Sequence, residues 1–370
     1  MDKNKRLTVW LPVIIAASIA LGIFIGNHYL SISQGKKRSY SSGNKINAIL
    51  DIIDEQYVDT VSMSKLVEST IPKIFSELDP HSVYIPAEDA SVVNEELEGS
   101  FSGIGVSFNM QTDTILVISV ISGGPAEKAG LLPFDRIISI NDSIFSGKKK
   151  NQGEIMKTLR GAKNSTVKLG VQRGNSPELL YFDVTRGDVP VNSVDVSYEA
   201  AKGIGYIKVS KFARNTYNEF ITAIAKLKQA GCTSFVIDLR GNTGGYMDAA
   251  INMINEFMPE GRLIVYTEGK SFPRSDVYAN GTGTCKDAPI VVLTDEISAS
   301  ASEIFSGAIQ DNDRGTIIGR RTYGKGLVQT QMSLSDGSEM RLTIARYYTP
   351  SGRCIQKKYE MGNTDAYDQD

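Results

Sequence analysis

Ser300 has the sequence setting that best suits nucleophilic chemistry. The apolar run 290–293 predicts a buried strand, and a helical pattern begins at Ala301 after a stretch of small residues. At such a junction the Ser300 hydroxyl can be exposed, and the Ala301 amide can point at a developing oxyanion. A plain helix N-cap, where serine is favoured, is the competing interpretation.

Lys325 lies between Gly324 and Gly326 in an otherwise apolar segment, where an ammonium group can lose its hydration. An unperturbed lysine has a pKa near 10.4, so burial must lower it by about 2 to 3 units for general-base work. A plain turn is the competing interpretation of this segment. The chain holds two histidines, His28 and His81. His81 lies in an Asp-Pro-His-Ser turn, which favours a structural role over that of a base.

Together these pieces resemble the carboxyl-terminal processing peptidases, serine proteases that use a Ser/Lys dyad. The likeness covers residues 298–303 and 310–311, residues 322–325 with Gln329, and the Asp-Pro-His-Ser motif in residues 78–84. The resemblance implies that Ser300 is the nucleophile, that Lys325 is the general base and that Gln329 orients the lysine.

Three further residues match positions that the family needs for activity or local structure: Glu303, Asp311 and Thr322. Helix capping or ion pairing would explain them as well. The three cysteines, Cys232, Cys285 and Cys354, match no metal-ligand spacing, so neither a metal nor a cofactor is expected.

From Gly187 onward, strand and helix patterns alternate, which predicts an α/β core with a mostly parallel sheet. Gly244 and Gly245 follow one of its predicted strands, where glycine backbone amides could face a ligand. The resemblance implies that this turn and the Ala301 amide form an oxyanion hole. Which of the two glycines donates is left open.

Residues 99–186 predict short strands and one helix, in an order that resembles a PDZ domain of the processing-peptidase type. PDZ domains bind extended peptide ends by strand addition, and loop amides capture the terminal carboxylate. An ordinary hairpin turn explains the Gly-x-Gly pattern of residues 103–105 equally well. Phe134 and Asp142 stand where glycine is common. The predicted carboxylate-binding loop is Gly103, Ile104, Gly105 and Val106.

The N-terminus carries Lys3, Lys5 and Arg6 before an apolar run, residues 9–26, which would be roughly 27 Å long as a helix. Basic residues before the run place that end in the cytoplasm. We expect an uncleaved, single-pass anchor in the inner membrane, with the rest of the chain on the periplasmic or another extracytoplasmic side. A cleaved signal peptide is the alternative.

Charge is nearly balanced, with 40 basic and 42 acidic side chains, so no nucleic-acid footprint is present. Residues 319–326 also approach a phosphate-binding P-loop. Gly326 takes the place of the required Ser or Thr, and strand patterns follow it in place of a helix, so nucleotide binding is not expected.

We expect a membrane-anchored serine endopeptidase that cleaves polypeptides with apolar C-termini at or near those ends, and the chain could form a homo-oligomer. The alternative is a PDZ-bearing scaffold with an inactive hydrolase-like core. Intact Ser300, Lys325 and Gln329 favour the first. The C-terminus could be truncated. The predicted parts are a tip and anchor (1–30), a linker (31–44), a helical region (45–98), a PDZ domain (99–186), a protease core (187–360) and an acidic tail (361–370).

Overall fold

The computed structural model describes residues 16, 18–21, 42–111, 114–145, 152–362 and 367. The chain divides into two compact units, Met1–Ser69 and Thr70–Asp370. α2 (Ser42–Gln56) lies in the first unit, and α3 (Met63–Ser76) starts there. Most of the predicted membrane span 9–26 and of the acidic tail 361–370 lies outside the described residues. Among the described helices, none has both the length and the apolar character that a membrane span requires.

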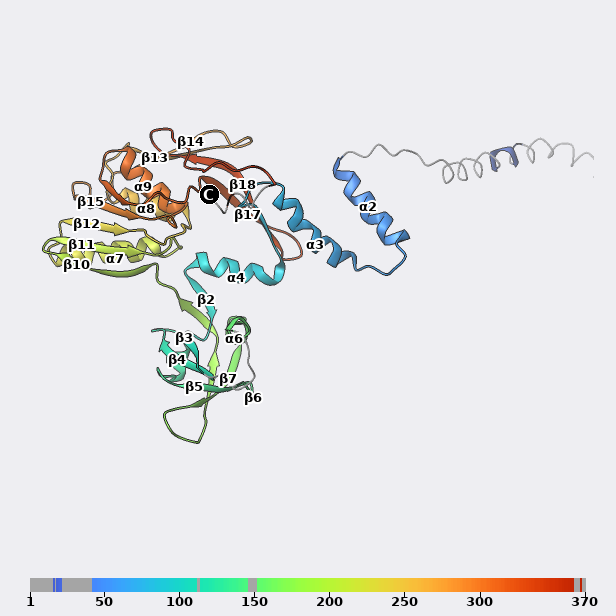
Figure 1. The fold of residues 1–370 in the computed structure, drawn as a ribbon, viewed down its shortest axis with the longest axis horizontal. Helices are drawn as coiled ribbons and strands as arrows, with labels where there is room; N and C mark the ends of the chain where they lie inside the picture. The colour runs from blue at the N-terminus through green and yellow to red at the C-terminus, as the bar shows by residue number, and fades with distance from the viewer. Residues whose placement is uncertain are drawn as a thin grey trace, which may run out of the picture. The chain divides into compact units, whose positions relative to one another are not determined.

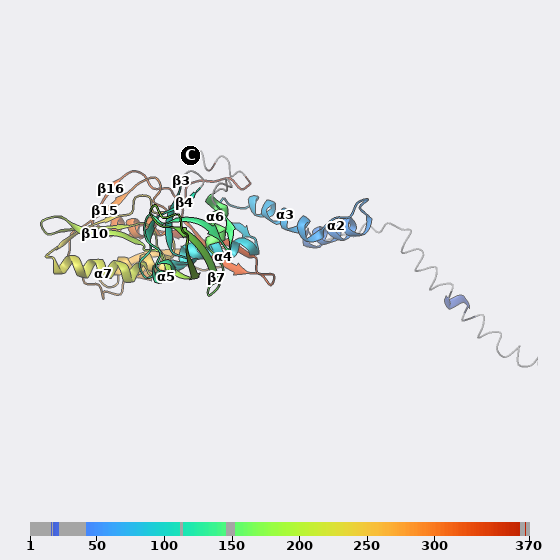
Figure 2. The ribbon, with the colours of Figure 1, turned by 90° about the horizontal axis from the view of Figure 1, so that it is seen from below.

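A mostly parallel sheet forms one layer of the core, in the strand order β10-β11-β12-β15-β16, with β10 antiparallel to β11. Because parallel strands follow one another in chain order and such crossovers are right-handed, the connecting helices share one face of the sheet. α8 packs against both α7 and α9, and α7 runs alongside β10 (Figures 1 and 2). The elements are β10 (Val194–Ala201), β11 (Ile204–Val209), α7 (Thr216–Gln229), β12 (Ser234–Asp238), α8 (Met247–Asn255), β15 (Ile290–Thr294), α9 (Ala301–Asp311) and β16 (Thr316–Gly319).

Aromatic packing holds this helical layer together. Phe257, just beyond α8, makes edge contacts with Phe220 of α7 and Phe305 of α9, with ring centroids 6.2 and 6.4 Å apart. All three side chains are fully buried. Burial of one such side chain stabilises a fold by about 1.5 to 3 kcal/mol. The contacts therefore fix α9, and with it the position of Ser300 at its N-terminus.

A second, antiparallel sheet completes the core and was not predicted from the sequence. Residues 83–85, expected within a helical region, form β1 and pair with β18, with Val83 opposite Arg341. Three residues show no usable periodicity, and their partner lies far along the chain, so pattern alone could not find this pairing. The strands are β1 (Val83–Ile85), β13 (Leu263–Glu268), β14 (Ser275–Tyr278), β17 (Leu327–Ser333) and β18 (Glu339–Tyr348).

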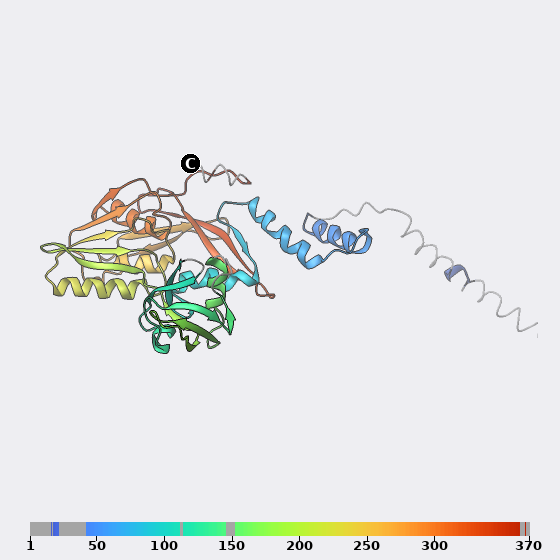
Figure 3. The same ribbon diagram turned by 60° about the horizontal axis from the view of Figure 1, so that its bottom comes forward.

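The predicted PDZ segment has its own buried core, which includes Val117, Ile137 and Leu169. α4 (Ala87–Glu98) precedes it. The strands β2 (Ser100–Gly103) and β9 (Gly187–Pro190), at the two ends of this segment in the sequence, pair with each other. Figure 3 brings its strands and α6 forward. Its elements are β3 (Val106–Gln111), β4 (Thr114–Val120), α5 (Pro125–Ala129), β5 (Arg136–Ile140), β6 (Ser143–Ile144), α6 (Gln152–Leu159), β7 (Thr166–Gln172) and β8 (Leu180–Thr185).

The two positions where glycine is common in this type of domain both have left-handed backbone. Phe134 has φ 70° and Asp142 has φ 62°. A non-glycine residue in this region costs about 1 to 2 kcal/mol. Local bonds hold both turns: the Phe134 amide donates to the Val117 carbonyl at 2.8 Å, and the Asp142 carboxylate pairs with Lys168 at 2.8 Å.

Candidate active site

Ser300 immediately precedes α9, as predicted, and its backbone is unusual. Its φ of 53° and ψ of −112° place a non-glycine residue at positive φ. Strain of this kind gathers at functional sites. The neighbouring serines are fully buried: Ser298 donates to the Leu239 carbonyl at 2.8 Å and Ser302 to the Asn242 carbonyl at 3.0 Å. Ser300, which is partly exposed, is therefore the best placed of the three serines to act as a nucleophile.

Asn242 connects the glycine turn to the serine turn. Its buried side chain donates to the Val209 carbonyl at 3.0 Å, and its own carbonyl accepts from the Ala299 amide at 3.0 Å. Its Oδ1 accepts from the Gly244 amide at 2.8 Å, forming an Asx turn. Sequence analysis missed Asn242, although the Asn-Thr-Gly-Gly run was a turn signal.

Gly244 packs directly against the serine. A Cβ added to Gly244 would lie 2.8 Å from the Ser300 Cβ and 3.0 Å from the Ala301 nitrogen. Since Asn242 already accepts from the Gly244 amide, that N–H is occupied. Within the described part of the chain, the Gly245 and Ala301 amides donate to no acceptor. These two N–H groups are the ones available to an incoming oxygen.

Lys325 is half-buried, and its surroundings favour the neutral amine. Burial lowers the pKa of Lys325, and Arg341 acts in the same direction, while Asp79 and Glu303 oppose them. The direction is the one that a general base requires. Among the hydrogen bonds of the described residues, none joins the Lys325 ammonium to the Ser300 hydroxyl.

Tyr347 is buried, 2% exposed, and contacts the lysine loop. Its hydroxyl donates to the Lys325 carbonyl and lies within hydrogen-bonding reach of the Ser300 side chain. β18 holds it there, because the Tyr347 amide donates to the Gly326 carbonyl at 3.0 Å. Sequence analysis missed Tyr347, since no motif distinguishes it from other strand residues.

Glu303 brings the serine and lysine segments together. Its carboxylate accepts from the amides of Ser300 at 2.8 Å, Lys325 at 2.9 Å and Gly324 at 2.7 Å. Burial raises the pKa of Glu303, and hydrogen bonds from Thr322 and these amides act against the rise. Glu303 and Thr322 therefore lie beside the predicted dyad.

Asp311 lies at the C-terminal end of α9, and its carboxylate stabilises the turn at Ser351. Its Oδ2 accepts from the Ser351 hydroxyl at 2.6 Å and the Ser351 amide at 3.1 Å, and it also pairs with Arg353. Burial would raise the pKa of Asp311, but hydrogen bonds from Ser351 and Thr349 outweigh it and lower the pKa. These contacts connect Asp311 to the C-terminal segment and not to Ser300.

The structure places Gln329 differently from the role that the resemblance implies. Its side-chain amide donates to the His81 carbonyl, and no hydrogen bond among the described residues joins it to Lys325. His81 Nε2 lies 3.0 Å from the Tyr367 hydroxyl. Asp79 accepts from the His81 amide at 3.0 Å and the Ser82 hydroxyl at 2.5 Å, which builds the turn.

The predicted peptide-binding loop connects β2 to β3. Gly103 ends β2 and Val106 begins β3, while the Ile104 side chain is buried. The carbonyl of Ile104 accepts from the Ala126 amide at 2.6 Å, and Gly105 has φ +80°. In the described part of its sheet, β3 is the terminal strand, so one edge is open to strand addition.

Comparison with known proteins identifies the family. Residues 203–364 match the model of peptidase family S41, and residues 102–195 match that of the PDZ domain. The chain is 33% identical over 365 residues to a probable CtpA-like serine protease of Staphylococcus aureus, across 96% of this chain and 72% of that protein. The chain belongs to peptidase family S41. This confirms the predicted carboxyl-terminal processing peptidase and its PDZ domain.

Two more relatives of the peptidase are similar in sequence. The carboxy-terminal processing protease CtpB of Bacillus subtilis is 35% identical over 318 residues, across 85% of this chain and 66% of CtpB. The peptidase therefore spans about two thirds of the length of that relative. A solved photosystem II D1 C-terminal processing protease is 28% identical, across 86% of this chain and 91% of that one, with a TM-score of 0.48.

Proposed function

We propose that the peptidase hydrolyses polypeptide chains with Ser300 as nucleophile and Lys325 as general base. The observation that carries the proposal is that one carboxylate, Glu303, holds the main chain of both residues. Helix α9 and the lysine loop are thereby kept in a fixed relation, which is the positioning that a two-residue catalytic unit needs. Burial of Lys325 supports the proton-acceptor role.

The chemistry follows in two stages. Neutral Lys325 accepts the Ser300 proton as Oγ attacks the scissile carbonyl, and the amides of Ala301 and Gly245 stabilise the oxyanion. Lys325 then gives the proton to the leaving amine, and water hydrolyses the acyl-enzyme by the reverse route. Since no hydrogen bond among the described residues joins the Ser300 hydroxyl to the Lys325 amine, the two side chains must first turn toward each other. Gln329 would orient Lys325 in that active arrangement after leaving the His81 carbonyl.

The decisive experiment compares the full chain with Ser300→Ala on an unfolded polypeptide, with the cut sites mapped by mass spectrometry. Ser300→Ala should abolish cleavage and leave the melting temperature nearly unchanged, because it removes one small hydroxyl at a helix start, which contributes at most about 1 kcal/mol of capping. A folded Ser300→Ala protein that still cleaves would exclude Ser300 as nucleophile. A wild-type protein that binds peptides without cutting them would favour the scaffold alternative.

We further propose that the PDZ domain selects substrates with a free, apolar C-terminus. The open edge of β3 and the adjoining loop at Gly105 support this, because strand addition there would bring the peptide end toward loop amides. A peptide with an amidated end should bind more weakly than the free acid. Equal binding and cleavage of the two forms would contradict the proposal.

Membrane anchoring is proposed from the sequence. Lys3, Lys5 and Arg6 followed by the apolar run 9–26 support a single inner-membrane span with the catalytic part outside the cytoplasm. A reporter fused after Asp370 should then be extracytoplasmic, and the protein should sediment with membranes. Mature protein that begins near residue 27 and is free of membranes would establish a cleaved signal.

A further inference from the structure

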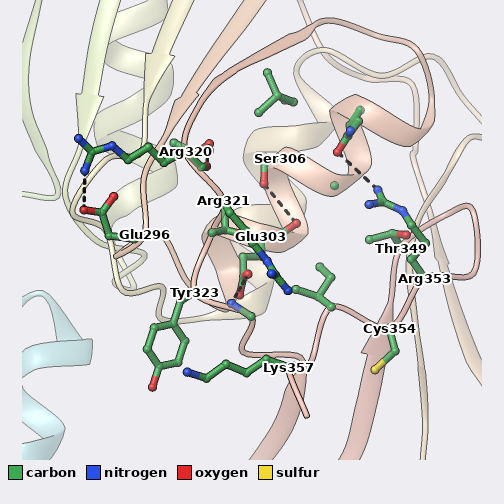
Figure 4. Close-up of a pocket in the computed structure, with 17 residues that line it drawn as sticks. Glu296, Glu303, Ser306, Arg320, Arg321, Tyr323, Thr349, Arg353, Cys354 and Lys357 are labelled. Atoms are coloured by element: carbon green, nitrogen blue, oxygen red, sulfur yellow. Dashed lines mark hydrogen bonds and ion pairs between the residues drawn. The ribbon is translucent and has the colours of Figure 1, made fainter. Parts of the chain in front are cut away.

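A cavity of about 680 Å³ lies beside α9, outside the proposed catalytic residues (Figure 4). Helix α9, the loop 320–324 and the segment 349–357 form most of its walls, and Thr294, Glu296 and Ile317 complete them. Neither Ser300 nor Lys325 lines it, but Glu303 does. Its volume falls in the range of small-molecule sites. The cavity therefore adjoins, through Glu303, the carboxylate that holds the serine and lysine segments.

Positive charge dominates the cavity walls, although the whole chain carries a formal net charge of −2. Arg320 is paired with Glu296 at 2.8 Å, and Arg353 is paired with Asp311. Lys357 donates to the Tyr367 carbonyl at 2.7 Å. These cations already have partners in the protein.

Arg321 is different. It is exposed, and none of the described residues gives it an ion pair or a hydrogen bond. Figure 4 shows its guanidinium directed into the cavity. A guanidinium offers five N–H donors in a planar fork that matches carboxylate and phosphate groups. An unpaired arginine at the centre of a concave site is suited to an oxyanion.

We propose that this cavity binds a small organic anion, carrying a carboxylate or phosphate group, with Arg321 as its anchor. The side chain of Lys357, which also lines the cavity, adds long-range attraction. Ile317 and Ile355 also line the cavity and can contact an apolar part of the ligand. The carboxylate of Glu303 is engaged by backbone amides, so it remains directed to them.

The site is placed to influence catalysis. Arg321 directly precedes Thr322, whose hydroxyl bonds to Glu303, and Gly324 donates to the same carboxylate. A ligand on Arg321 holds the loop that carries Lys325, and it should raise kcat/KM by limiting motion of the base. This consequence rests on the proposed function, whereas binding itself does not.

Calorimetry on the full chain at constant ionic strength tests the site, with inorganic phosphate and succinate as separate probes. At least one probe should bind, and Arg321→Gln should weaken it about tenfold or more, since charged hydrogen bonds are lost. The matched control, Lys270→Gln, removes an exposed cation outside the cavity and should bind as the wild type does.

Binding of a single probe supports the site and identifies the group it prefers. Ser300→Ala should bind the same probe unchanged, which separates this inference from the proposed function. Equal affinity of Arg321→Gln and the wild type would overturn the proposal. The absence of detectable binding of either probe at tens of millimolar would also overturn it.

Discussion

Glu303 Oε2 lies 2.9 Å from the backbone nitrogen of Lys325, and the same oxygen accepts from the Ser300 amide at 2.8 Å. The glutamate is 1% exposed, so these bonds are shielded from water. A buried carboxylate that serves several amides is costly to replace, because each amide would lose its acceptor. Glu303 is therefore a positioning residue for both partners of the proposed dyad.

Replacing Glu303 with glutamine should reduce kcat/KM by about ten- to a hundredfold and lower stability by about 1.5 to 3 kcal/mol. Glutamine has one acceptor oxygen where glutamate has two, so the Ser300 and Lys325 segments lose part of their common support. Peptide kinetics and urea unfolding measure the two effects. Glu296→Gln, at an exposed glutamate, is the control. A fully active Glu303→Gln enzyme would show that Glu303 does not position the proposed dyad.

Lys325→Arg should be as inactive as Lys325→Ala, because guanidinium stays charged at any usable pH. In the proposed mechanism the neutral Lys325 amine is the reactive form, and its fraction grows as pH rises. Since burial lowers the pKa of Lys325, kcat/KM should rise through an apparent pKa below the ordinary lysine value. The same rise of kcat/KM with pH should be seen in His81→Gln. If Lys325→Arg were active, and if the rise of kcat/KM with pH were lost in His81→Gln, His81 would be the base.

Tyr347→Phe should lower kcat about tenfold with little change in KM, because the hydroxyl that supports the Lys325 carbonyl is removed. Stability should fall by about 1 kcal/mol. Tyr348→Phe is a matched control: its ring stacks on Tyr266 with centroids 4.8 Å apart, and this packing remains. Identical kinetics for the two variants would show that the Tyr347 hydroxyl has no catalytic influence.

Gly244→Ala should abolish activity, because the added Cβ would meet the Ser300 Cβ at 2.8 Å and the Ala299 carbonyl at 2.8 Å. Gly231→Ala is the control for backbone strain alone. Gly231 has φ +94° and open space around it, so its substitution should cost about 1 to 2 kcal/mol and leave kcat/KM intact. Retained activity in Gly244→Ala would mean that the glycine turn and the serine turn can move apart without loss of catalysis.

Asp238 should contribute to acid stability. It is 1% exposed, accepts from the Tyr206 hydroxyl at 2.6 Å and pairs with Arg240 at 2.6 Å. Burial acts to raise its pKa, but the bonds from Arg240 and Tyr206 outweigh burial and lower the pKa to about 2. Between the ordinary carboxyl pKa and about 2, the unfolded chain binds more protons. This contribution is therefore present above pH 4 and is lost as pH falls toward 2.

Asp238→Asn should accordingly lose about 1 to 2 kcal/mol at pH 7 and show a flatter stability curve between pH 4 and pH 2. Urea unfolding at several pH values measures both. Glu260→Gln, at an exposed carboxyl, should follow the wild-type curve. If Asp238→Asn and the wild type lost the same stability between pH 4 and pH 2, Asp238 would not be the source of the acid sensitivity.

Local pattern was sufficient for much of the fold. The junction at Ser300, the mostly parallel sheet and the helices of the core follow from periodicity and short-range turn chemistry, which depend on neighbours in the chain. The left-handed turns at Phe134 and Asp142 occur where the sequence departs from glycine. The family could be named for the same reason, since its motifs are short and contiguous.

The tertiary structure alone decided how the site is connected. Glu303 had been noted, but its bonds to Ser300 and Lys325 depend on the packing of α9 against the lysine loop. Tyr347 reaches the site through the register of β18, and Asn242 occupies the Gly244 amide through a folded turn. A buried donor or acceptor must find a partner, and which partner it finds is set by segments far apart in sequence.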